Sequence, residues 1–413
     1  MRDLAGSIRS SSEAAPRATP TRVPSAGHTA QCRATGLHLS IRPLEAGREI
    51  ASAWSALAKR SLTVNIFYEP EFALPARLPF GDRVRLLAIH ADDSSNAQLL
   101  GLWPFRLVRF RWGVPLPVLL GWTHPFAASG VPLIDRDRAD EALTALLNIS
   151  SSLPGLPSRA LLPLIPDAGP FADALAKVQA GLGLRDVRTE SHDRAFFTPG
   201  LTDDTLAHLS SGSRSKLRQE YRRLEKDGPI TLDSVEVPDQ LGDALENYLE
   251  LEAKGWKGRA GTAIPSSPVE TQFMRSVTQS LAEQGRVRID RLKLGERVIA
   301  SSITYRNGSV VWYAKISFDE EFAKNSPGSQ LAVKVTEALN TDPSISFADS
   351  CAPPHHPLMR RFWPERMELS HRMLELAAKD VLLPVAVYLE RQRPVVREYY
   401  HLAKRWLKSR RAK

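Results

Sequence analysis

Two ionisable side chains stand near the ends of apolar runs, where strands usually deliver side chains to a site. Lys315 lies at the end of the run 309–316, just before a polar loop, and Asp349 closes a short apolar run further on. An ammonium there can meet a phosphate or a developing oxyanion. A carboxylate can take a proton from a nucleophile or orient it. A solvated strand-end lysine and a loop carboxylate bonded to nearby N–H groups are the simpler alternatives, and both stay open.

The stretch between these two residues contains a candidate anion site. The loop 324–329 reads Lys-Asn-Ser-Pro-Gly-Ser and leads into a helix-like run at 329–339. The first N–H groups of a helix have no partner inside the helix and favour negative charge. Pro327 has no N–H, so the loop offers few donors. The residues that we predict to hold an anion are Ser326, Gly328, Ser329 and Gln330.

A compact Gly-rich turn at 254–258 carries the candidate acceptor residues Trp256 and Lys257. The indole would form a wall and the amine would contact an anion, whereas a structural Trp that closes a helix end is the alternative. Tyr313 alternates with Trp312 along an apolar run, so one of the two aromatic rings must face inward. We include Tyr313 among the substrate-binding candidates, although either ring fits an ordinary core.

Positioning these residues requires a sheet. Three apolar runs at 287–294, 297–305 and 309–316 are joined by the tight turns Gly295-Glu296 and Asn307-Gly308. This pattern predicts an antiparallel meander. The helix-like run and the short strand ending at Asp349 follow it, and the first half of the chain shows a similar outline of strands and helices.

The segment 213–228 predicts a basic amphipathic helix. Leu217, Tyr221 and Leu224 form one apolar stripe, and arginines and lysines surround it. A solvated connector between two domains is one interpretation. A contact to an anionic substrate or cofactor is the other.

The composition limits the class of protein. The chain has 413 residues, 43% of them hydrophobic, and a net charge of +9. Such a length allows two or more domains, and a basic balance attracts anions without choosing among them. Cys32 and Cys351 are the only cysteines. Their number and spacing indicate neither a disulfide framework nor a zinc site, and they fit a reducing compartment.

The two ends of the sequence are polar or basic. Residues 1–36 are rich in Ser, Ala, Pro and Arg, which predicts a disordered tail. The end of the chain is basic, and we favour a solvated terminal helix there over a contact to an anionic membrane surface. Without an apolar run of about 18 residues or a signal-peptide centre, we expect a cytoplasmic protein.

The second half of the sequence resembles the acetyltransferase-like domains of the GNAT superfamily that occur with bacterial cellulose and exopolysaccharide genes. The resemblance rests on the turn 254–258 (KGWKG), the run 295–331, and the Asp349 strand end with Phe362-Trp363 beyond it. It covers about residues 214–373. The first half is similar to the more divergent GNAT-like half of the same proteins, an arrangement similar to that of Fem-type peptidyltransferases.

The resemblance implies an α+β fold of two tandem GNAT-like domains, each with a mixed, mostly antiparallel sheet flanked by helices. It implies acyl transfer from acetyl-coenzyme A or another acyl-coenzyme A to a sugar, a polysaccharide precursor or an amine, without a metal. The pyrophosphate would sit at Gly328-Ser329-Gln330. The boundaries that we predict are 1–36 for the tail, 37–205 for the first domain, 206–230 for a basic linker helix, 231–380 for the second domain and 381–413 for a basic helical tail.

Two other functions remain open. A Fem-like transferase would take its acyl group from an aminoacyl-tRNA, and the basic helix at 213–228 would suit that donor. A non-catalytic scaffold of a polysaccharide-synthesis complex would keep the fold without the cofactor, consistent with the unusual Pro327 loop. We expect no DNA partner.

Overall fold

The computed structural model describes residues 28–94, 96–354, 356–376 and 380–411, with side chains described as far as 397. Residues 1–27 of the predicted tail lie outside the described residues. The rest of that segment is ordered: strand β1 (His28–Gln31) pairs antiparallel with β2 (His38–Pro43), and Cys32 is buried behind it.

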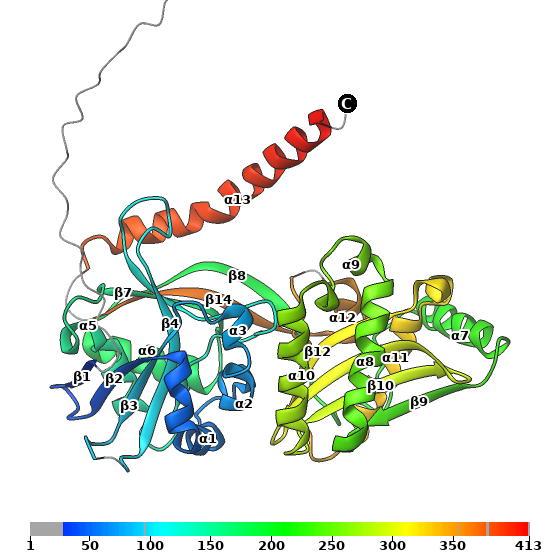
Figure 1. The fold of residues 1–413 in the computed structure, drawn as a ribbon, viewed down its shortest axis with the longest axis horizontal. Coiled ribbons are helices and arrows are strands. Elements are labelled where there is room, and N and C mark those ends of the chain that lie inside the picture. The colour runs from blue at the N-terminus through cyan, green and yellow to red at the C-terminus, as the bar shows by residue number, and fades with distance from the viewer. Residues whose placement is uncertain (1–27, 95, 355, 377–379, 412–413) are drawn as a thin grey trace, which may run out of the picture.

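One sheet runs through the whole molecule, in the order β1-β2-β3-β4-β5-β7-β14-β8-β13-β12-β11-β10-β9, with β6 paired to β4 (Figure 1). The remaining strands are β3 (Arg85–His90), β4 (Leu99–Val108), β5 (Val118–Gly121), β6 (Leu133–Ile134), β7 (Arg159–Pro166), β8 (Asp186–Phe197), β9 (Ile230–Val235), β10 (Val287–Leu294), β11 (Arg297–Asn307), β12 (Val310–Phe318), β13 (Phe347–Asp349) and β14 (Glu365–Glu375).

Helices cover both ends of this sheet. They are α1 (Ala51–Lys59), α2 (Pro70–Ala73), α3 (Arg77–Phe80), α4 (Ala139–Leu147), α5 (Ile149–Ser152), α6 (Pro170–Leu182), α7 (Ser211–Glu225), α8 (Pro238–Lys254), α9 (Trp256–Arg259), α10 (Pro268–Ala282), α11 (Pro327–Thr341), α12 (Pro357–Phe362) and α13 (Leu383–Arg411). Local signals set several ends. For example, the Ser267 side chain accepts from the Glu270 N–H before α10, and Pro268 opens that helix.

The predicted meander is confirmed. Strands β10, β11 and β12 pair antiparallel in sequence, and Gly295 and Gly308 adopt the positive φ angles that their turns require. The register of β11 with β12 shifts between the pairs Ile303–Lys315 and Thr304–Tyr313, so Ala314 is the extra residue of a β-bulge.

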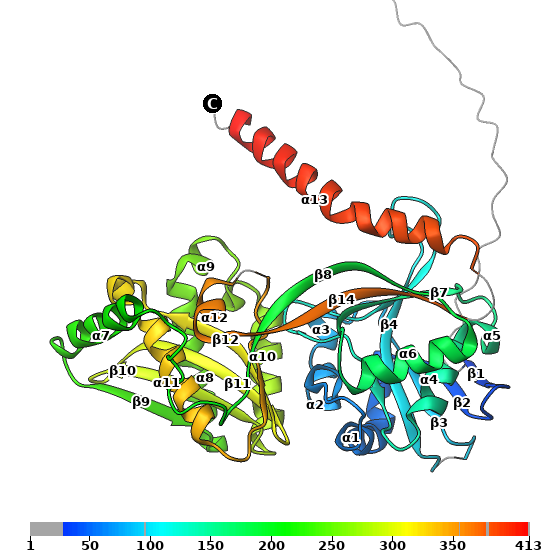
Figure 2. The same cartoon turned by 180° about the vertical axis from the view of Figure 1, so that it is seen from behind.

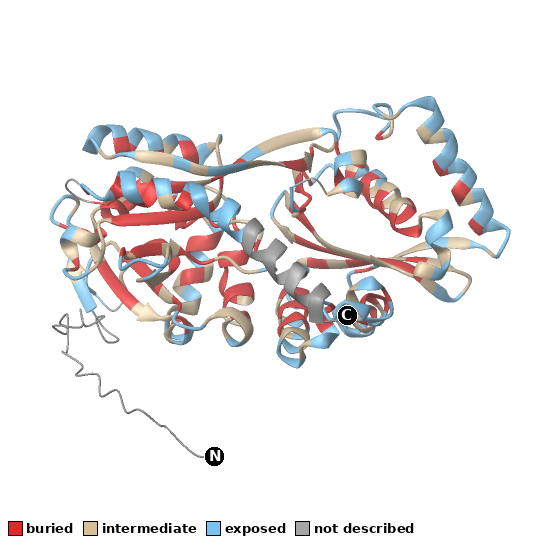
Figure 3. Cartoon of the chain, turned by 90° about the horizontal axis from the view of Figure 1, so that it is seen from above, coloured by how far each residue is buried: buried red, intermediate tan, exposed pale blue. Residues whose placement is uncertain are grey.

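The sheet is built from two similar units, as predicted. The first unit comprises β1–β7 with α1–α6, and the second comprises β9–β13 with α7–α12. Each unit has one parallel strand pair, β5 with β7 and β12 with β13, among strand pairs that are otherwise antiparallel in the described residues. The buried residues follow the strands and the helix faces that cover them (Figure 3).

Long strands join the two units (Figure 2). Strand β14 comes late in the chain, yet it lies between β7 and β8, and β8 continues to pair with β13. Side chains strengthen this junction. The Glu69 carboxylate before α2 accepts hydrogen bonds from Arg286 at 2.6 Å and from Asn307 at 2.5 Å. The units therefore share backbone hydrogen bonds as well as side-chain contacts.

Helix α7 packs on the second unit. Leu217 and Leu224 of its apolar stripe are buried, and the Gln330 side chain donates a 3.0 Å hydrogen bond to the Leu217 carbonyl. The segment that we predicted as a linker is thus a helix attached to α11. The domain boundaries given in the sequence analysis stay predictions.

Candidate active site

The two strands at the centre of the second unit separate. Strands β12 and β13 pair only at Val310–Phe347, Val311–Ala348 and Trp312–Asp349. The next N–H, that of Ser350, donates to the Ala195 carbonyl of β8 at 3.3 Å instead. Strand β12 continues to Phe318 without β13 beside it. Among the described strands none pairs with that side of β12 beyond Trp312, which is the opening expected for an extended ligand.

The bulge decides which side chains face the first unit. Directly opposite residues of paired strands lie on the same face, so Lys315 shares the face of Ile303, and Trp312 shares that of Tyr305. Ile303, Tyr305 and Trp312 all belong to the large core that continues into the first unit. Simple alternation would have placed Lys315 with Tyr313. Because of the extra residue, Lys315 faces the first unit and Tyr313 does not.

Lys315 lies at the junction of the units without a counterion. Its Nζ is 4.1 Å from the centre of the Phe126 ring, which belongs to the loop between β5 and β6. Within the described residues it makes neither an ion pair nor a hydrogen bond. Burial, the larger cause, and the nearby Lys257 together lower the pKa of Lys315 to about 8. The amine thus exchanges between charged and neutral forms near neutral pH.

Aromatic rings surround this lysine on the side of the first unit. His124 stacks on Phe80 with ring centres 4.5 Å apart, and Phe126 packs against Phe273 of α10 at 5.2 Å. Burial lowers the pKa of His124 to about 3, with Lys315 and Arg106 adding to the effect, so the imidazole is neutral at pH 7. Neither Phe126 nor His124 was predicted from the sequence as a site residue. Their only signal was the density of aromatic residues in the segment 110–132.

The predicted acceptor residues have different surroundings. Lys257 forms an ion pair with Glu252, with 2.6 Å between Lys257 Nζ and Glu252 Oε1. Glu252 is only 2% exposed. Glu252 also accepts from the Tyr248 hydroxyl and the Ile264 N–H. Trp256 is 58% exposed, and its backbone N–H donates to Glu320 Oε1 at 2.6 Å. Tyr313 is buried on the opposite face of the sheet, with its ring centre 5.9 Å from that of Trp363.

Asp349 lies on the same face as Trp312 but is engaged in an ion pair. The Arg194 guanidinium, from β8, is 3.2 Å from Asp349 Oδ2, and both side chains are buried. The Cys351 N–H donates to Oδ1 at 2.7 Å. Both oxygens therefore have partners, and Arg194 also donates to the Ala128 carbonyl of the first unit. This environment suits a residue that holds the junction together better than a free base.

The predicted anion loop offers few donors. Ser326 has a positive φ of 50° and precedes Pro327 at the start of α11. The N–H groups of Ser329 and Gln330 both donate to the Ser326 carbonyl, and the Gln330 side chain is directed to α7. Among the described groups of this loop start, Gly328 retains an N–H without an acceptor. A Cβ added at Gly328 would lie 3.2 Å from the Phe318 ring, so the backbone is closely packed there.

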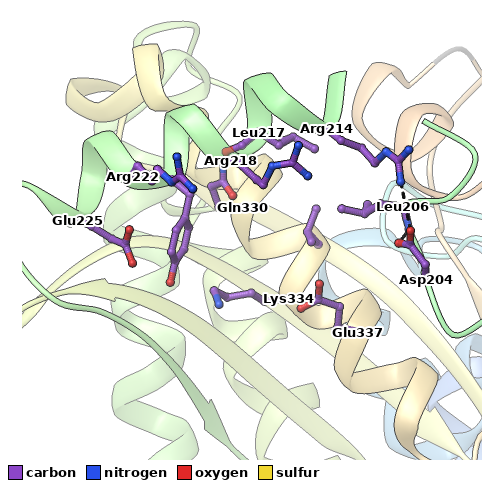
Figure 4. A pocket seen from close by; sticks show the side chains of 12 residues that line it. Asp204, Leu206, Arg214, Leu217, Arg218, Arg222, Glu225, Gln330, Lys334 and Glu337 are labelled. Carbon is purple, nitrogen blue, oxygen red and sulfur yellow. Dashed lines mark hydrogen bonds and ion pairs between the residues drawn. The ribbon is translucent and has the colours of Figure 1, made fainter. Parts of the chain in front are cut away.

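A pocket of about 360 Å³ lies between α7 and α11 (Figure 4). Arg218, Arg222 and Lys334 line it, and Lys334 Nζ is 5.0 Å from the centre of the Tyr221 ring. Arg214 is paired with Asp204 at 3.3 Å. Two further carboxylates, Glu225 and Glu337, line the same pocket. The basic helix therefore presents part of its charge to a cavity rather than only to solvent.

Within the described residues, no group of three or more His, Cys, Asp or Glu side chains is arranged to hold a metal ion. Among the same residues, no helix combines the length and hydrophobicity needed to cross a membrane.

Comparison with known proteins agrees with the geometry of the second unit. Residues 211–349 match the acetyltransferase (GNAT) domain family. No curated protein matches the sequence. Among solved structures, FemX is similar with a TM-score of 0.54 and 11% identity, covering 79% of this chain and 96% of FemX.

Two further solved structures are similar at lower scores. A protein of unknown function from Bacteroides thetaiotaomicron has a TM-score of 0.49 and 12% identity, over 79% of this chain and 97% of that one. The C-terminal domain of a putative lysylphosphatidylglycerol synthetase from Agrobacterium fabrum has a TM-score of 0.49 and 13% identity, over 84% of this chain and 96% of that one. Residues 211–349 thus match the GNAT acetyltransferase domain, and the whole chain has a fold similar to that of FemX, with two GNAT-like units.

Proposed function

We propose that the chain is an acyltransferase that moves an acyl group onto an amine or hydroxyl at the junction of its two units. One observation carries the proposal. Lys315, an ammonium without a counterion, faces the junction from β12 just beyond the point where β13 leaves that strand. A positive charge held in apolar surroundings is worth far more to a developing negative charge than the same group in water.

The chemistry follows from this placement. The acceptor's lone pair attacks the acyl carbonyl, and the carbonyl oxygen gains negative charge. The carbonyl then re-forms as the bond to the leaving group breaks, and the leaving group takes up the proton that the acceptor loses. Lys315 donates a hydrogen bond to that oxygen while it is negative. The free edge of β12 positions the donor, which supplies the entropic part of the rate enhancement. His124 is neutral, so it adds no competing positive charge to the site.

The donor that the family match favours is an acyl-coenzyme A. The arm of the donor would run along β12, and the Gly328 N–H at the start of α11 would contact its pyrophosphate. Titration calorimetry with acetyl- and longer acyl-coenzyme A tests this donor. Heat of binding with a dissociation constant in the micromolar range is expected, and an absence of binding to all of them would reject coenzyme A as the donor.

A second candidate donor is an aminoacyl-tRNA. Two observations favour it: the anion loop retains a single free N–H, and Arg218 and Arg222 line the pocket beside α11. Binding of bulk tRNA should then weaken steeply with salt. Changing both arginines to Gln should reduce the magnitude of the log–log salt slope by about 1.4–1.8. Arg223→Gln is the matched control, because Arg223 does not line the pocket. Unchanged binding in the double variant would reject this donor.

The acceptor remains an expectation from the resemblance: a sugar, a polysaccharide precursor or an amine, in the cytoplasm. Screening such acceptors for turnover with the bound donor would identify it. A scaffold role predicts the opposite outcome, which is stable co-purification with polysaccharide-synthesis proteins and no transfer to any acceptor.

A further inference from the structure

The beginning of helix α13 has two apolar faces on opposite sides. Leu383, Ala386, Val387 and Glu390 are buried against the first unit. The other side of the helix is also apolar but exposed. It carries Val385, Tyr388, Val395 and Val396, at successive spacings of three, seven and one residues. Tyr388 is 63% exposed and Val396 64%. Figures 1 and 2 show α13 extending away from both units. The second face therefore has no partner within the described chain.

The buried face fixes the orientation of the helix. Glu390 accepts two hydrogen bonds from the Arg111 guanidinium, each 2.7 Å, and a third from the Trp112 indole at 2.7 Å. Arg111 and Trp112 belong to the loop between β4 and β5. Phe110 and Val114 of the same loop are exposed, Phe110 to 65%. The anchored Glu390 carboxylate thus holds an exposed aromatic loop beside α13.

The charge of this region points to the kind of partner. From residue 383 to the end of the sequence there are nine lysines and arginines and two glutamates. Tyr399, Leu402 and Trp406 continue the apolar spacing in the sequence, with cations between them. A helix with aliphatic and aromatic residues on one side and Lys and Arg beside them lies in the interface of an anionic bilayer.

We propose that α13 and the β4–β5 loop form a docking surface for an anionic lipid membrane. The helix would lie in the plane of the headgroups, with Tyr388, Val395 and Val396 inserted and the neighbouring arginines at the lipid phosphates. Nucleic acid is a poorer fit, because binding to phosphates alone would leave the exposed apolar side in water. The proposal is independent of the donor and of the acyl-transfer site.

Sedimentation with vesicles tests the proposal on the full chain. Vesicles of phosphatidylcholine with about 30% phosphatidylglycerol should pellet the protein, because anionic headgroups attract Lys and Arg, and pure phosphatidylcholine should not. The variant Tyr388→Ser/Val395→Ser/Val396→Ser should lower the partition coefficient about tenfold or more. Arg393→Gln/Arg397→Gln should lower it by a similar factor and reduce its salt dependence.

Control variants distinguish insertion of α13 into the membrane from nonspecific hydrophobic binding. Leu201→Ser removes an equally exposed apolar side chain elsewhere and should leave binding unchanged. Equal sedimentation of the serine triple variant and the native chain would overturn the proposal. Failure of the native chain to bind anionic vesicles would also overturn it, as would retention on tRNA with no retention on vesicles.

Discussion

The Nζ of Lys315 lies 4.1 Å from the centre of the Phe126 ring, and the two residues come from different units of the molecule. Two physical effects oppose each other at this contact. Burial disfavours the ammonium, and the negative face of the ring favours it. The pKa falls to about 8, so burial is the larger effect. The junction therefore holds a lysine that is cationic at neutral pH but loses its proton easily.

Replacement of Lys315 tests its role directly. Lys315→Met keeps the length and apolar stem but removes the charge, so we expect kcat to fall by about 10²–10³ with little change in donor affinity. Lys293→Met is the control, because Lys293 pairs with Asp233 at 2.9 Å, away from the junction. The proposal fails if Lys315→Met turns over at the native rate.

The variant Lys315→Met should also differ from the native chain in stability, by an amount that depends on pH. The pKa of Lys315 is lowered from 10.5 to about 8 in the folded state. Below pH 8 the buried charge therefore lowers the free energy of unfolding by its full amount. That cost is relieved as the pH rises from about 8 to 10.5, because the folded state then binds fewer protons than the unfolded state. Lys315→Met should exceed the native chain in unfolding free energy by about 1–3 kcal/mol at pH 7, after allowing for screening. Urea denaturation at pH 7 and pH 10 should show this advantage shrinking. A constant difference would contradict the assignment.

Removal of the ring should move the pH profile. Phe126→Leu takes away an attraction worth about 0.5–2 kcal/mol to the ammonium, so the pKa of Lys315 should fall by about one unit. Since the ammonium is the active form, the high-pH limb of kcat should shift to lower pH. Phe80→Leu is the matched control, because Phe80 stacks on His124 rather than on Lys315. A limb that stays in place in Phe126→Leu would exclude the contact from catalysis.

Local patterns in the sequence predicted part of this site. The meander followed from apolar runs separated by Gly295 and Gly308, because turn chemistry acts over a few residues. The face of Lys315 did not follow, because simple alternation placed it with Tyr313 and nothing in the sequence signals the bulge at Ala314. The bulge depends on pairing with β11, which a single strand's pattern does not contain.

Contacts between residues distant in the sequence were the other feature that the sequence did not predict. The sequence predicted Asp349 either as a base or as a carboxylate bonded to nearby N–H groups. Its partner Arg194 lies 155 positions earlier, on a strand that joins the two units. Phe126 reaches Lys315 across the same junction. Trp256 was expected in a pocket and is largely exposed. Contacts between units depend on the docking of whole domains, so composition and spacing do not reveal them.

The ion pair of Asp349 with Arg194 predicts a structural penalty. Breaking a buried pair leaves one uncompensated charge, so Asp349→Asn and Arg194→Met should each cost about 3–5 kcal/mol in unfolding free energy. The double variant Asp349→Asn/Arg194→Met should cost less than the sum, which a double-mutant cycle in urea measures. Glu141→Gln, which breaks an exposed pair with Arg138, should change stability little. Additive effects of the two junction variants would show that the residues do not interact. Loss of turnover by Asp349→Asn, in protein that remains folded at native stability, would instead restore the carboxylate as a base.

The loop before α11 gives the sharpest test of the donor. Pro327 removes one N–H from the group that would hold a pyrophosphate, and Ser329 and Gln330 direct theirs to Ser326. Pro327→Ala adds a donor beside Gly328, so acyl-coenzyme A should bind up to about tenfold more tightly, as a hydrogen bond to a charged group allows. Loss of the rigid ring should cost about 0.4–1 kcal/mol in stability.

Pro268→Ala supplies the matched control, since Pro268 also opens a 15-residue helix but lies in α10. It should repeat the small loss of stability without any gain in affinity. If Pro327→Ala binds acyl-coenzyme A no better than Pro268→Ala does, the pyrophosphate does not sit at this helix start. Because the aminoacyl-tRNA alternative places no pyrophosphate there, that outcome together with salt-sensitive tRNA binding would decide in favour of the second donor.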